Sequence, residues 1–427
     1  MRVLMFGWEF PPHITGGLGT ACFGLTKALA KIGVKIKFIV PKTFGDEDIS
    51  LVNLLGAENI QINQRHFNYE EFWNKITYLE IGSNLIPYVS PELFKKLSEE
   101  NKLDGVNFKE NTFSASFKFS GKYGKDLMEE VARYALIAGA LAAMNDYDII
   151  HSHDWLTYPA GIVAKQVSGK PLVIHVHATE FDRSGENINQ NVYDIERKGM
   201  ETADRIITVS NFTKNIVINR YGIDPKKITT VYNGIDLYNY DNGNRKPDTL
   251  YNDKIVTFLG RVTFQKGPDY FVEAANKVLK KYKNVRFVMA GSGDMLNRMI
   301  KRVAHLGISN KFHFTGFLKG YEVDEMFKYS NVYVMPSVSE PFGISPLEAM
   351  RSNVPVIISK QSGVSEILNH ALKIDFWDID AMADAIYGLL NYDALSRFFV
   401  KYGKGEVDNL KWDNAAHHVN EIYHQVI

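Results

Sequence analysis

Short apolar runs alternate with helix-length segments along most of the chain. Where strands alternate with helices, the sheets are parallel and covered on both faces, so the pattern predicts an α/β fold. Helix-length segments between the runs include residues 18–32, 156–167, 268–281 and 321–329. The runs with the composition of buried strands fall into two series, residues 2–7, 35–40, 147–152, 171–177, 205–210 and 228–233, and then 254–260, 285–291, 311–316, 332–337 and 354–359.

A polar segment separates the two series. Residues 237–254 are rich in Asn, Asp, Gly and Pro, which is linker composition. We therefore expect two doubly wound domains, residues 1–240 and 241–409. Residues 44–124 interrupt the first series without clean alternation, and we expect them to form an insertion. Residues 410–427 carry apolar side chains at helical spacing and predict an amphipathic helix.

The composition narrows the classes of partner. The 49 Lys and Arg residues balance the 49 Asp and Glu residues, which gives no support to a nucleic-acid partner or a membrane-surface partner. No stretch of about 18 apolar residues occurs, so we expect no integral membrane segment. The single Cys22 excludes an intrachain disulfide and fits a reducing compartment. The apolar run at the N-terminus is short for a signal peptide, and we expect a cytoplasmic protein.

The stretch SVSEPFGISPLEAM, residues 337–350, places Glu340 and Glu348 on either side of a turn. One interpretation is structural: Ser345, Pro346 and Glu348 fit a capping box, with Ser345 as N-cap. The other is functional. A strand, a turn and a helix N-terminus present backbone N–H groups and a positive dipole end to an anion, and the acids would hold hydroxyls. A nucleotide sugar has both phosphates and hydroxyls.

Two further loops suit a phosphate group. In LGRVTFQKG, residues 259–267, Arg261 and Lys266 lie between a strand and a helix. A guanidinium and an ammonium there suit a diphosphate; alone they are equally well explained as solvated loop cations. In ITGGLG, residues 14–19, glycines could bring backbone amides close to a phosphate, or simply form a tight turn. This stretch is neither a Walker A loop nor G-x-G-x-x-G.

Histidine pairs and D-x-D pairs raise the question of a metal. His151 and His153 share a face at the end of one strand, as do His175 and His177 at the next. We prefer contact with a substrate to a zinc site, and we read Asp154 as the N-cap of the following helix. The D-x-D pairs fall at the start of a strand (146–148) and at a helix N-cap (378–380). We therefore expect neither a metal nor a cofactor.

Together the motifs resemble the retaining glycosyltransferases of the GT-B fold, family 4, and the related glycogen and starch synthases. The resemblance covers nearly the whole chain apart from residues 44–124. It implies two Rossmann-like domains that face each other across a cleft. The N-terminal domain would lie on the acceptor side and the C-terminal domain would bind the nucleotide sugar. The last helix would cross back onto the N-terminal domain. The motifs that carry the resemblance are WEFPPHITGGLG, HSHDW, HVHATEFDR, VYNGID, GRVTFQKG, GSGD, EPFGISPLE and WDNAAHHVNEIY.

The resemblance also implies roles for single residues. Arg261 and Lys266 would neutralise the donor diphosphate and assist its departure. Glu340 would contact the hydroxyls of the donor sugar, Glu348 would accept from the ribose hydroxyls, and His177 would lie beside the sugar. Further donor contacts would come from Gly17, beside the diphosphate, and from the backbone of Phe342, Gly343 and Ile344, while Asp154, Asn233 and Gly293 fall in motifs that line the cleft.

The expected reaction is metal-independent transfer of a hexose with retention. The donor would be a nucleotide-diphosphate sugar, UDP- or ADP-glucose, and the acceptor a carbohydrate such as an α-glucan. Ile14 stands where many glycogen and starch synthases have Lys, so the resemblance supports a glycosyltransferase more firmly than a glucan synthase. Rival functions on the same fold are a nucleotide-sugar epimerase, a phosphorylase with pyridoxal phosphate and a non-catalytic sugar-binding protein.

Overall fold

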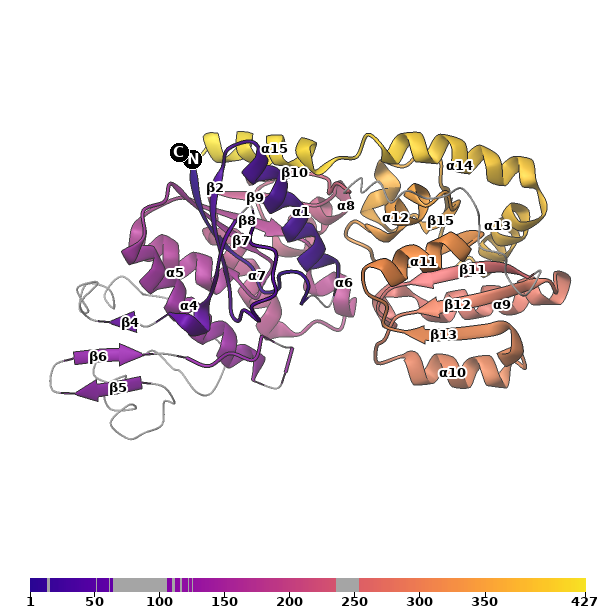
Figure 1. Ribbon diagram of the computed structural model, residues 1–427, viewed down its shortest axis with the longest axis horizontal. Coiled ribbons are helices and arrows are strands. Elements are labelled where there is room, and N and C mark those ends of the chain that lie inside the picture. Colours follow the sequence, from indigo (N-terminus) through magenta and orange to yellow (C-terminus); the bar gives the residue numbers. More distant parts are fainter. Residues whose placement is uncertain are drawn as a thin grey trace.

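Two parallel sheets, each covered by helices, make up the computed structural model (Figure 1). Residues 237–252 of the predicted linker and most of the predicted insertion lie outside the described residues, and residue 254 of the predicted linker begins a strand of the second sheet. Among the residues that are described, no helix is long and apolar enough to cross a membrane. The structure describes residues 1–13, 16–50, 52–60, 62–63, 106–109, 112–115, 117–121, 123–124, 126–235 and 253–427.

The first sheet has seven parallel strands in the order β10-β9-β8-β7-β1-β2-β3. The chain runs outward from β1 to one edge, returns, and then runs to the other edge. The strand order therefore reverses between β1 and β7, where ligands bind in open α/β sheets. The strands are β1 (Arg2–Phe6), β2 (Lys35–Val40), β3 (Asn53–Gly56), β7 (Ile149–His153), β8 (Leu172–Val176), β9 (Arg205–Thr208) and β10 (Ile228–Thr230). The helices are α1 (Gly17–Lys31), α4 (Leu127–Met144), α5 (Tyr158–Ser168), α6 (Glu180–Ser184), α7 (Gln190–Thr202) and α8 (Asn211–Tyr221).

The second sheet repeats this plan with six parallel strands in the order β13-β12-β11-β14-β15-β16. Its strand order reverses between β11 and β14. The strands are β11 (Lys254–Leu259), β12 (Val285–Ala290), β13 (Phe312–Gly316), β14 (Val332–Met335), β15 (Val356–Ser359) and β16 (Leu372–Ile374). The helices are α9 (Pro268–Lys281), α10 (Leu296–His305), α11 (Tyr321–Tyr329), α12 (Ser345–Arg351), α13 (Ile379–Asn391) and α14 (Asp393–Val407).

Shorter elements complete the described chain. Three short strands, β4 (Ile62–Asn63), β5 (Val106–Lys109) and β6 (Thr112–Ala115), form a small antiparallel sheet. Short 3-10 turns follow β3, β11 and β15 and precede β10 and β13. They are η1 (Ala57–Asn59), η3 (Pro225–Lys227), η4 (Phe264–Lys266), η5 (Ser309–Lys311) and η6 (Gly363–Glu366).

Apolar clusters cover both faces of each sheet. On the first sheet, residues of α4, α5 and α7 pack on one face and residues of α1 on the other. On the second sheet, α9, α10 and α13 cover one face and α11 and α12 the other. Central strands buried on both faces explain why the strands read as continuous apolar runs. The predicted α/β class with two doubly wound sheets is confirmed.

One part of the predicted organisation needs correction. Residues 53–56, which we assigned to an insertion, form β3 and pair in parallel with β2 at the edge of the first sheet. The stretch NLLG is too short to show alternation, and only the pairing with β2 makes it a strand. The N-terminal sheet is therefore one strand wider than the sequence indicated.

The final helix, α15 (Trp412–His424), lies against α1 over the first sheet (Figure 1). Its apolar side chains join the cluster formed by the inner faces of α1, β1 and β2. Gly24 of α1 makes this contact close, because a Cβ there would lie 2.3 Å from the Trp412 indole. Where the chain crosses back, the Ile235 N–H donates to the Leu410 carbonyl at 2.8 Å. The chain thus passes from the second sheet back to the first.

Candidate active site

The loops at the carboxyl ends of the two sheets contact each other. α6, which follows β8, contacts η4, which follows β11. The Ser339 hydroxyl donates to Asp182 Oδ1 at 2.5 Å, and the Ser210 hydroxyl donates to the Pro341 carbonyl. The residues predicted to bind donor therefore lie on facing loops. They sit at the edges where open parallel sheets bind ligands.

Lys266 and Glu340 form an ion pair at the point where the second sheet reverses its strand order. Lys266 Nζ donates to Glu340 Oε2 at 2.5 Å, and the Ser337 hydroxyl donates to the same oxygen at 3.2 Å. The Glu340 side chain is only 8% exposed. Its backbone is fixed as well: the Glu340 N–H donates to the Gln361 carbonyl, and the Glu340 carbonyl accepts from the Gly363 N–H. A buried acid and an ammonium are thus held together on two neighbouring loops.

Arg261 lies on the same loop as Lys266 and is exposed. Its guanidinium makes a long contact of 3.4 Å with Gln265 Oε1, so an anion could engage it at little cost. The turn after β12 supports this loop, since the Val262 N–H donates to the Ser292 carbonyl at 2.9 Å. A Cβ on Gly293 would lie 2.3 Å from the Val262 carbonyl oxygen. Gly293 therefore allows the two backbones to approach.

The predicted capping box at Ser345 is wrong. α12 begins at Ser345 itself, Ile344 precedes it in the cap position, and no side chain caps the helix. The Ser345 hydroxyl instead lies 2.7 Å from the Tyr333 hydroxyl of β14. Burial raises the pKa of Tyr333 well above its ordinary value, and the charges of Glu340 and Glu348 raise it further. The negative charges of both glutamates therefore act on the buried Tyr333 hydroxyl. Glu348 does not cap the helix.

Glu348 itself is half-buried on the first turn of α12. Burial raises the pKa of Glu348 above its ordinary value, while the nearby Arg351 guanidinium opposes the rise. A carboxylate in this position can accept from hydroxyl groups that approach the helix N-terminus.

The turn between Glu340 and α12 joins the two halves of the molecule. Phe342 is buried beside the Tyr232 ring, and its carbonyl accepts from the Val364 N–H. Gly343 has a φ of +99°, which a residue with a side chain adopts only with strain. Ile344 packs against apolar clusters of both sheets. The backbone that we expect to meet the donor is thus held rigidly.

Gly17 is the first residue of α1, and it is exposed. A Cβ there would meet no described residue within 4 Å. The N–H groups of this first turn have no partner within the helix, and the positive end of the helix dipole lies here. The position suits an anion. Ile14, the departure from the synthase pattern, lies outside the described residues.

Asp154 does not cap α5 as predicted. The helix begins at Tyr158 with Thr157 in the cap position. Asp154 follows β7 with a φ of +59°, and its Oδ1 accepts from the backbone N–H groups of His177 at 2.7 Å and Ala178 at 3.3 Å. It therefore fixes the loop after β8. Burial raises the pKa of Asp154 to about 6.

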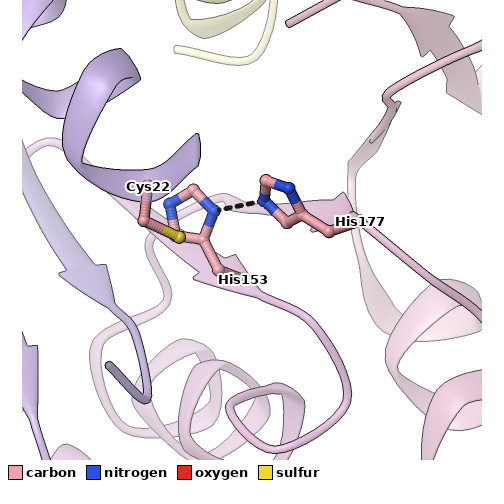
Figure 2. Close-up of side chains that lie close together, drawn as sticks. All are labelled: Cys22, His153 and His177. Atoms are coloured by element: carbon pink, nitrogen blue, oxygen red, sulfur yellow. Dashed lines mark hydrogen bonds between the residues drawn. The ribbon is translucent and has the colours of Figure 1, made fainter. Parts of the chain in front are cut away.

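His177 stands at the outer end of a row of histidine rings. Its Nε2 lies 3.0 Å from Nδ1 of His153 (Figure 2), while His151 and His175 continue the row inward. His177 is half-buried, whereas the other three are buried. Burial lowers the pKa of His177 to about 3, so the ring is neutral near pH 7. A neutral imidazole beside a sugar can orient a hydroxyl.

Asn233 lies where the chain leaves the first sheet. It is buried, and the next residue, Gly234, has no room for a side chain, because a Cβ there would lie 2.3 Å from the Trp412 backbone nitrogen. Asn233 is thus held beside the crossing of the two connecting segments, at the boundary between the sheets.

Both D-x-D pairs have structural partners. Asp146 and Asp148 pair with Arg2 at the start of β7, far from the carboxyl edge of the sheet. Asp378 accepts from the Ala381 N–H and caps α13, as predicted. Neither pair lies with the residues of the candidate site.

Two carboxylates that join the loops are absent from the predicted site residues. Asp182 accepts from the Thr179 N–H and hydroxyl at the start of α6, besides the contact with Ser339 of the other half. The spacing of Thr179 and Asp182 is a capping-box signal that could have been used. Glu366 accepts from the N–H groups of Asn211 and Phe212 at the start of α8. No local pattern predicts that contact, since 154 residues separate Phe212 from Glu366.

Comparison with known families agrees with this geometry. Residues 242–406 match the family described as glycosyl transferases group 1, and residues 113–238 match glycosyltransferase family 4. The two matches cover most of both sheets, including the loops that carry Lys266, Glu340 and His177.

Relatives and solved structures span the whole chain. An uncharacterized glycosyltransferase of Methanocaldococcus jannaschii is 27% identical, over 99% of this chain and 98% of that protein. A glycogen synthase of Mycobacterium tuberculosis is 23% identical, over 99% and 94%. Sucrose-phosphate synthase from Thermosynechococcus elongatus has a similar fold, with a TM-score of 0.72, 18% identity and coverage of 99% and 98%. HepE of Anabaena, solved in complex with UDP-glucose, has a TM-score of 0.65 at 15% identity, with coverage of 100% of both chains.

The matched families agree with the donor site expected from Glu340, Glu348, Arg261 and Lys266. Two glycosyltransferase family models match consecutive parts of the chain, and glycosyltransferases match it end to end. The paired doubly wound sheets are those of the GT-B fold. The chain therefore belongs to the family 4-like glycosyltransferases of the GT-B fold.

Proposed function

We propose that the chain is a retaining, metal-independent hexosyltransferase that moves a sugar, with glucose as the first choice, from a nucleotide-diphosphate donor to a carbohydrate acceptor. The observation that carries the proposal is the Lys266–Glu340 pair at the reversal point of the second sheet, with Arg261 on the same loop. Residues 241–409 would bind the nucleotide sugar. Residues 1–240 with 410–427 would bind the acceptor.

The chemistry depends on charge. Breaking the anomeric C–O bond leaves a cationic sugar and an anionic nucleoside diphosphate, and preorganised cations lower the energy of that separation. Arg261 is exposed, and Lys266 is paired with Glu340 in the structure. When a diphosphate binds, Lys266 would turn from the carboxylate to a phosphate oxygen. Glu340 would then accept from sugar hydroxyls. The same ion pair would thus supply both the group that binds the phosphate and the group that binds the sugar.

The proposed stereochemistry rests on the resemblance to the retaining GT-B glycosyltransferases, and the residues at the candidate site are compatible with it. Burial lowers the pKa of His177 to about 3, which makes its ring a weak base, and Glu340 would be occupied by the sugar hydroxyls. We therefore assign the acceptor's proton to the departing phosphate, on the same face as the attack. A double displacement with Glu340 as nucleophile is less favoured. The Gly17 N–H and the backbone of Phe342, Gly343 and Ile344 would hold the diphosphate and sugar, and Glu348 would hold the ribose.

A donor and acceptor screen tests the proposal. The protein is incubated with UDP-glucose, ADP-glucose and other nucleotide sugars, with and without an α-glucan, and released nucleoside diphosphate is measured. We expect acceptor-dependent release, an α-linked product by NMR, and activity that survives excess chelator. Loss of activity on chelation with rescue by manganese would contradict the metal-independent mechanism. Conversion of the nucleotide sugar to its epimer without release would favour an epimerase instead.

A further inference from the structure

Four histidines and the chain's one cysteine gather at the carboxyl ends of β7 and β8. His151 and His153 stack with ring centroids 4.3 Å apart, and His175 and His177 do the same on the neighbouring strand. The register places His153 opposite His175. Cys22 lies on the buried face of α1, next to this row (Figure 2). Transfer as proposed above uses only His177 of these five residues.

The buried rings carry polar atoms that have no partner. Within the part of the chain that the structure describes, His151 Nε2, His153 Nε2 and both ring nitrogens of His175 are buried without a hydrogen bond. A neutral imidazole has one donor and one acceptor nitrogen. Each buried polar group left unsatisfied reduces the stability of the folded state. Apolar residues would fill the same space without that cost. Among the residues with unpartnered nitrogens, only His153 belongs to the outer group of Cys22, His153 and His177, so a ligand bound to that group would remove this cost at His153.

The spacing of the outer three residues suits a metal ion. One ligand atom each of Cys22, His153 and His177 lies within 4.8 Å of the other two. Around tetrahedral Zn²⁺, with bonds of about 2.0–2.3 Å, neighbouring ligand atoms are roughly 3.3–3.8 Å apart. Small side-chain rotations therefore close the site. We propose that Cys22, His153 and His177 bind a thiophilic divalent cation, Zn²⁺ in the first instance, with its fourth position directed toward the candidate active site.

The alternative set of three histidines is less suitable. His151, His153 and His175 also lie within 4.8 Å of one another, but all three are fully buried and none is anionic. A dication there would bring its whole charge into the core. The outer set has a thiolate to offset one charge, and its His177 is half-buried and not fully buried, which gives the ion a path from solvent.

The surroundings of Cys22 also favour a cation. The negative charges of Asp154 and Glu9 act on Cys22. Both carboxylates are buried, and neither lies in the coordinating set. A bound metal would displace the thiol proton and be stabilised by the same negative field.

Cobalt binding to the full-length chain gives a direct test. Co²⁺ is titrated into chelator-treated protein, and a thiolate-to-cobalt charge-transfer band is followed. Because Cys22 is the only cysteine, such a band can arise only there. We expect one Co²⁺ per chain with this band, and Cys22→Ser should lose the band and weaken Zn²⁺ binding at least about 100-fold, the upper range for loss of an outer partner. The His417→Ala/His418→Ala double variant removes two exposed histidines and should change neither.

Two results would overturn the proposal. One is the absence of bound Co²⁺, and the other is bound Co²⁺ without the thiolate band, which would place the ion on histidines alone. X-ray absorption at the zinc edge of the wild-type protein should show one sulfur and two imidazole nitrogens. That measurement needs no variant, so it decides the question even if a substitution impairs folding.

A consequence for activity rests on the proposed function. Zn²⁺ would hold His177 away from the donor sugar and so inhibit transfer, although transfer itself needs no metal. Wild-type activity should fall with added Zn²⁺ and return with chelator, while Cys22→Ser should keep its activity. Inhibition that is equal in both proteins would contradict this consequence. Failure of the transferase assay alone would leave the cobalt result standing, which separates the two proposals.

Discussion

At the residue scale, Lys266 has two roles. It neutralises the Glu340 carboxylate in the structure, and it would neutralise the donor diphosphate in the reaction. Lys266→Ala and Arg261→Ala should each lower turnover roughly 100-fold. Each removes about 3 kcal/mol of transition-state stabilisation. Steady-state assays on folded variants check this. Arg298→Ala is the matched control, because Arg298 is 69% exposed and pairs with Asp269 on the surface.

The two roles of Lys266 can be separated. Lys266→Ala leaves Glu340 buried without its cation, which should also reduce the free energy of unfolding by about 1–3 kcal/mol. In the Lys266→Ala/Glu340→Gln double variant the stability should recover, while turnover stays low. Rates within twofold of wild type for both Lys266→Ala and Arg261→Ala would show that the assignment is wrong.

Glu348 gives a prediction that depends on pH. Its ionised form would accept from the ribose, and burial raises its pKa. As the pH falls, the carboxylate takes up its proton at a higher pH than an exposed glutamate does. The KM for the donor should therefore rise on acidification, beginning above the ordinary glutamate range. Glu348→Gln should raise the KM about 10-fold at neutral pH, since a hydrogen bond to a charged group is lost.

The pH profile distinguishes this role from a structural one. In Glu348→Gln the donor KM should no longer depend on pH in that range. Glu325→Gln, which changes an exposed glutamate of α11, should behave as wild type. A Glu348→Gln profile parallel to that of the wild type would remove Glu348 from the donor site.

Local spacing indicated the chemistry of single residues but not all their partners. The types and order of Arg261, Lys266, Glu340 and Glu348 sufficed to indicate a site for phosphate and hydroxyls. The cap assigned to Ser345 failed because β14 brings Tyr333 within hydrogen-bond distance of it. A competing partner from another element cannot be read from a capping pattern.

At the scale of elements, Gly267 fixes the loop that carries Lys266. Its φ of +65° lies in the left-handed region, and a Cβ there would lie 2.1 Å from the Pro336 carbonyl oxygen. Gly267→Ala therefore meets conformational strain of about 1–2 kcal/mol and a backbone clash as well. We expect lower thermal stability and lower turnover together, because Lys266 would shift with the loop.

Gly405→Ala supplies the control for this prediction. Gly405 lies in α14, and a Cβ there meets nothing within 4 Å. Alanine in a helix interior should be neutral or stabilise by up to about 1 kcal/mol relative to glycine. If Gly267→Ala melts and turns over like Gly405→Ala, the tight turn is not what positions Lys266.

Helices and strands were predictable where a single segment was long enough to show an apolar run or a helical period. The predicted strand 35–40 matches β2, and the predicted helices 268–281 and 321–329 match α9 and α11. The short edge strands β3 and β16 were missed, because each has too few residues to show a periodic pattern. Predicted strand 228–233 ends at Thr230, because the following residues turn toward the other half of the molecule.

At the scale of the whole molecule, the order of the two sheets followed from the sequence, but their contacts did not. The hydroxyl of Ser210 meets the Pro341 carbonyl, and a Cβ on Gly363 would lie 2.2 Å from that same carbonyl oxygen. Each of these residues looks ordinary in its own segment. The fit between the halves exists only after both have folded, so periodicity and local motifs carry no signal for it.

The last prediction concerns α15, which returns to the first sheet. Trp412 is 5% exposed and fills the space that Gly24 leaves on α1. Trp412→Ala opens a cavity there and should cost about 3–5 kcal/mol. Trp377→Ala is the control, since Trp377 is 57% exposed and its loss should change stability by no more than about 0.5 kcal/mol. Hydrogen exchange should locate the effect of Trp412→Ala in α1 and α15. Faster exchange confined to α9–α14, or equal melting of the two variants, would show that α15 does not stabilise the first sheet.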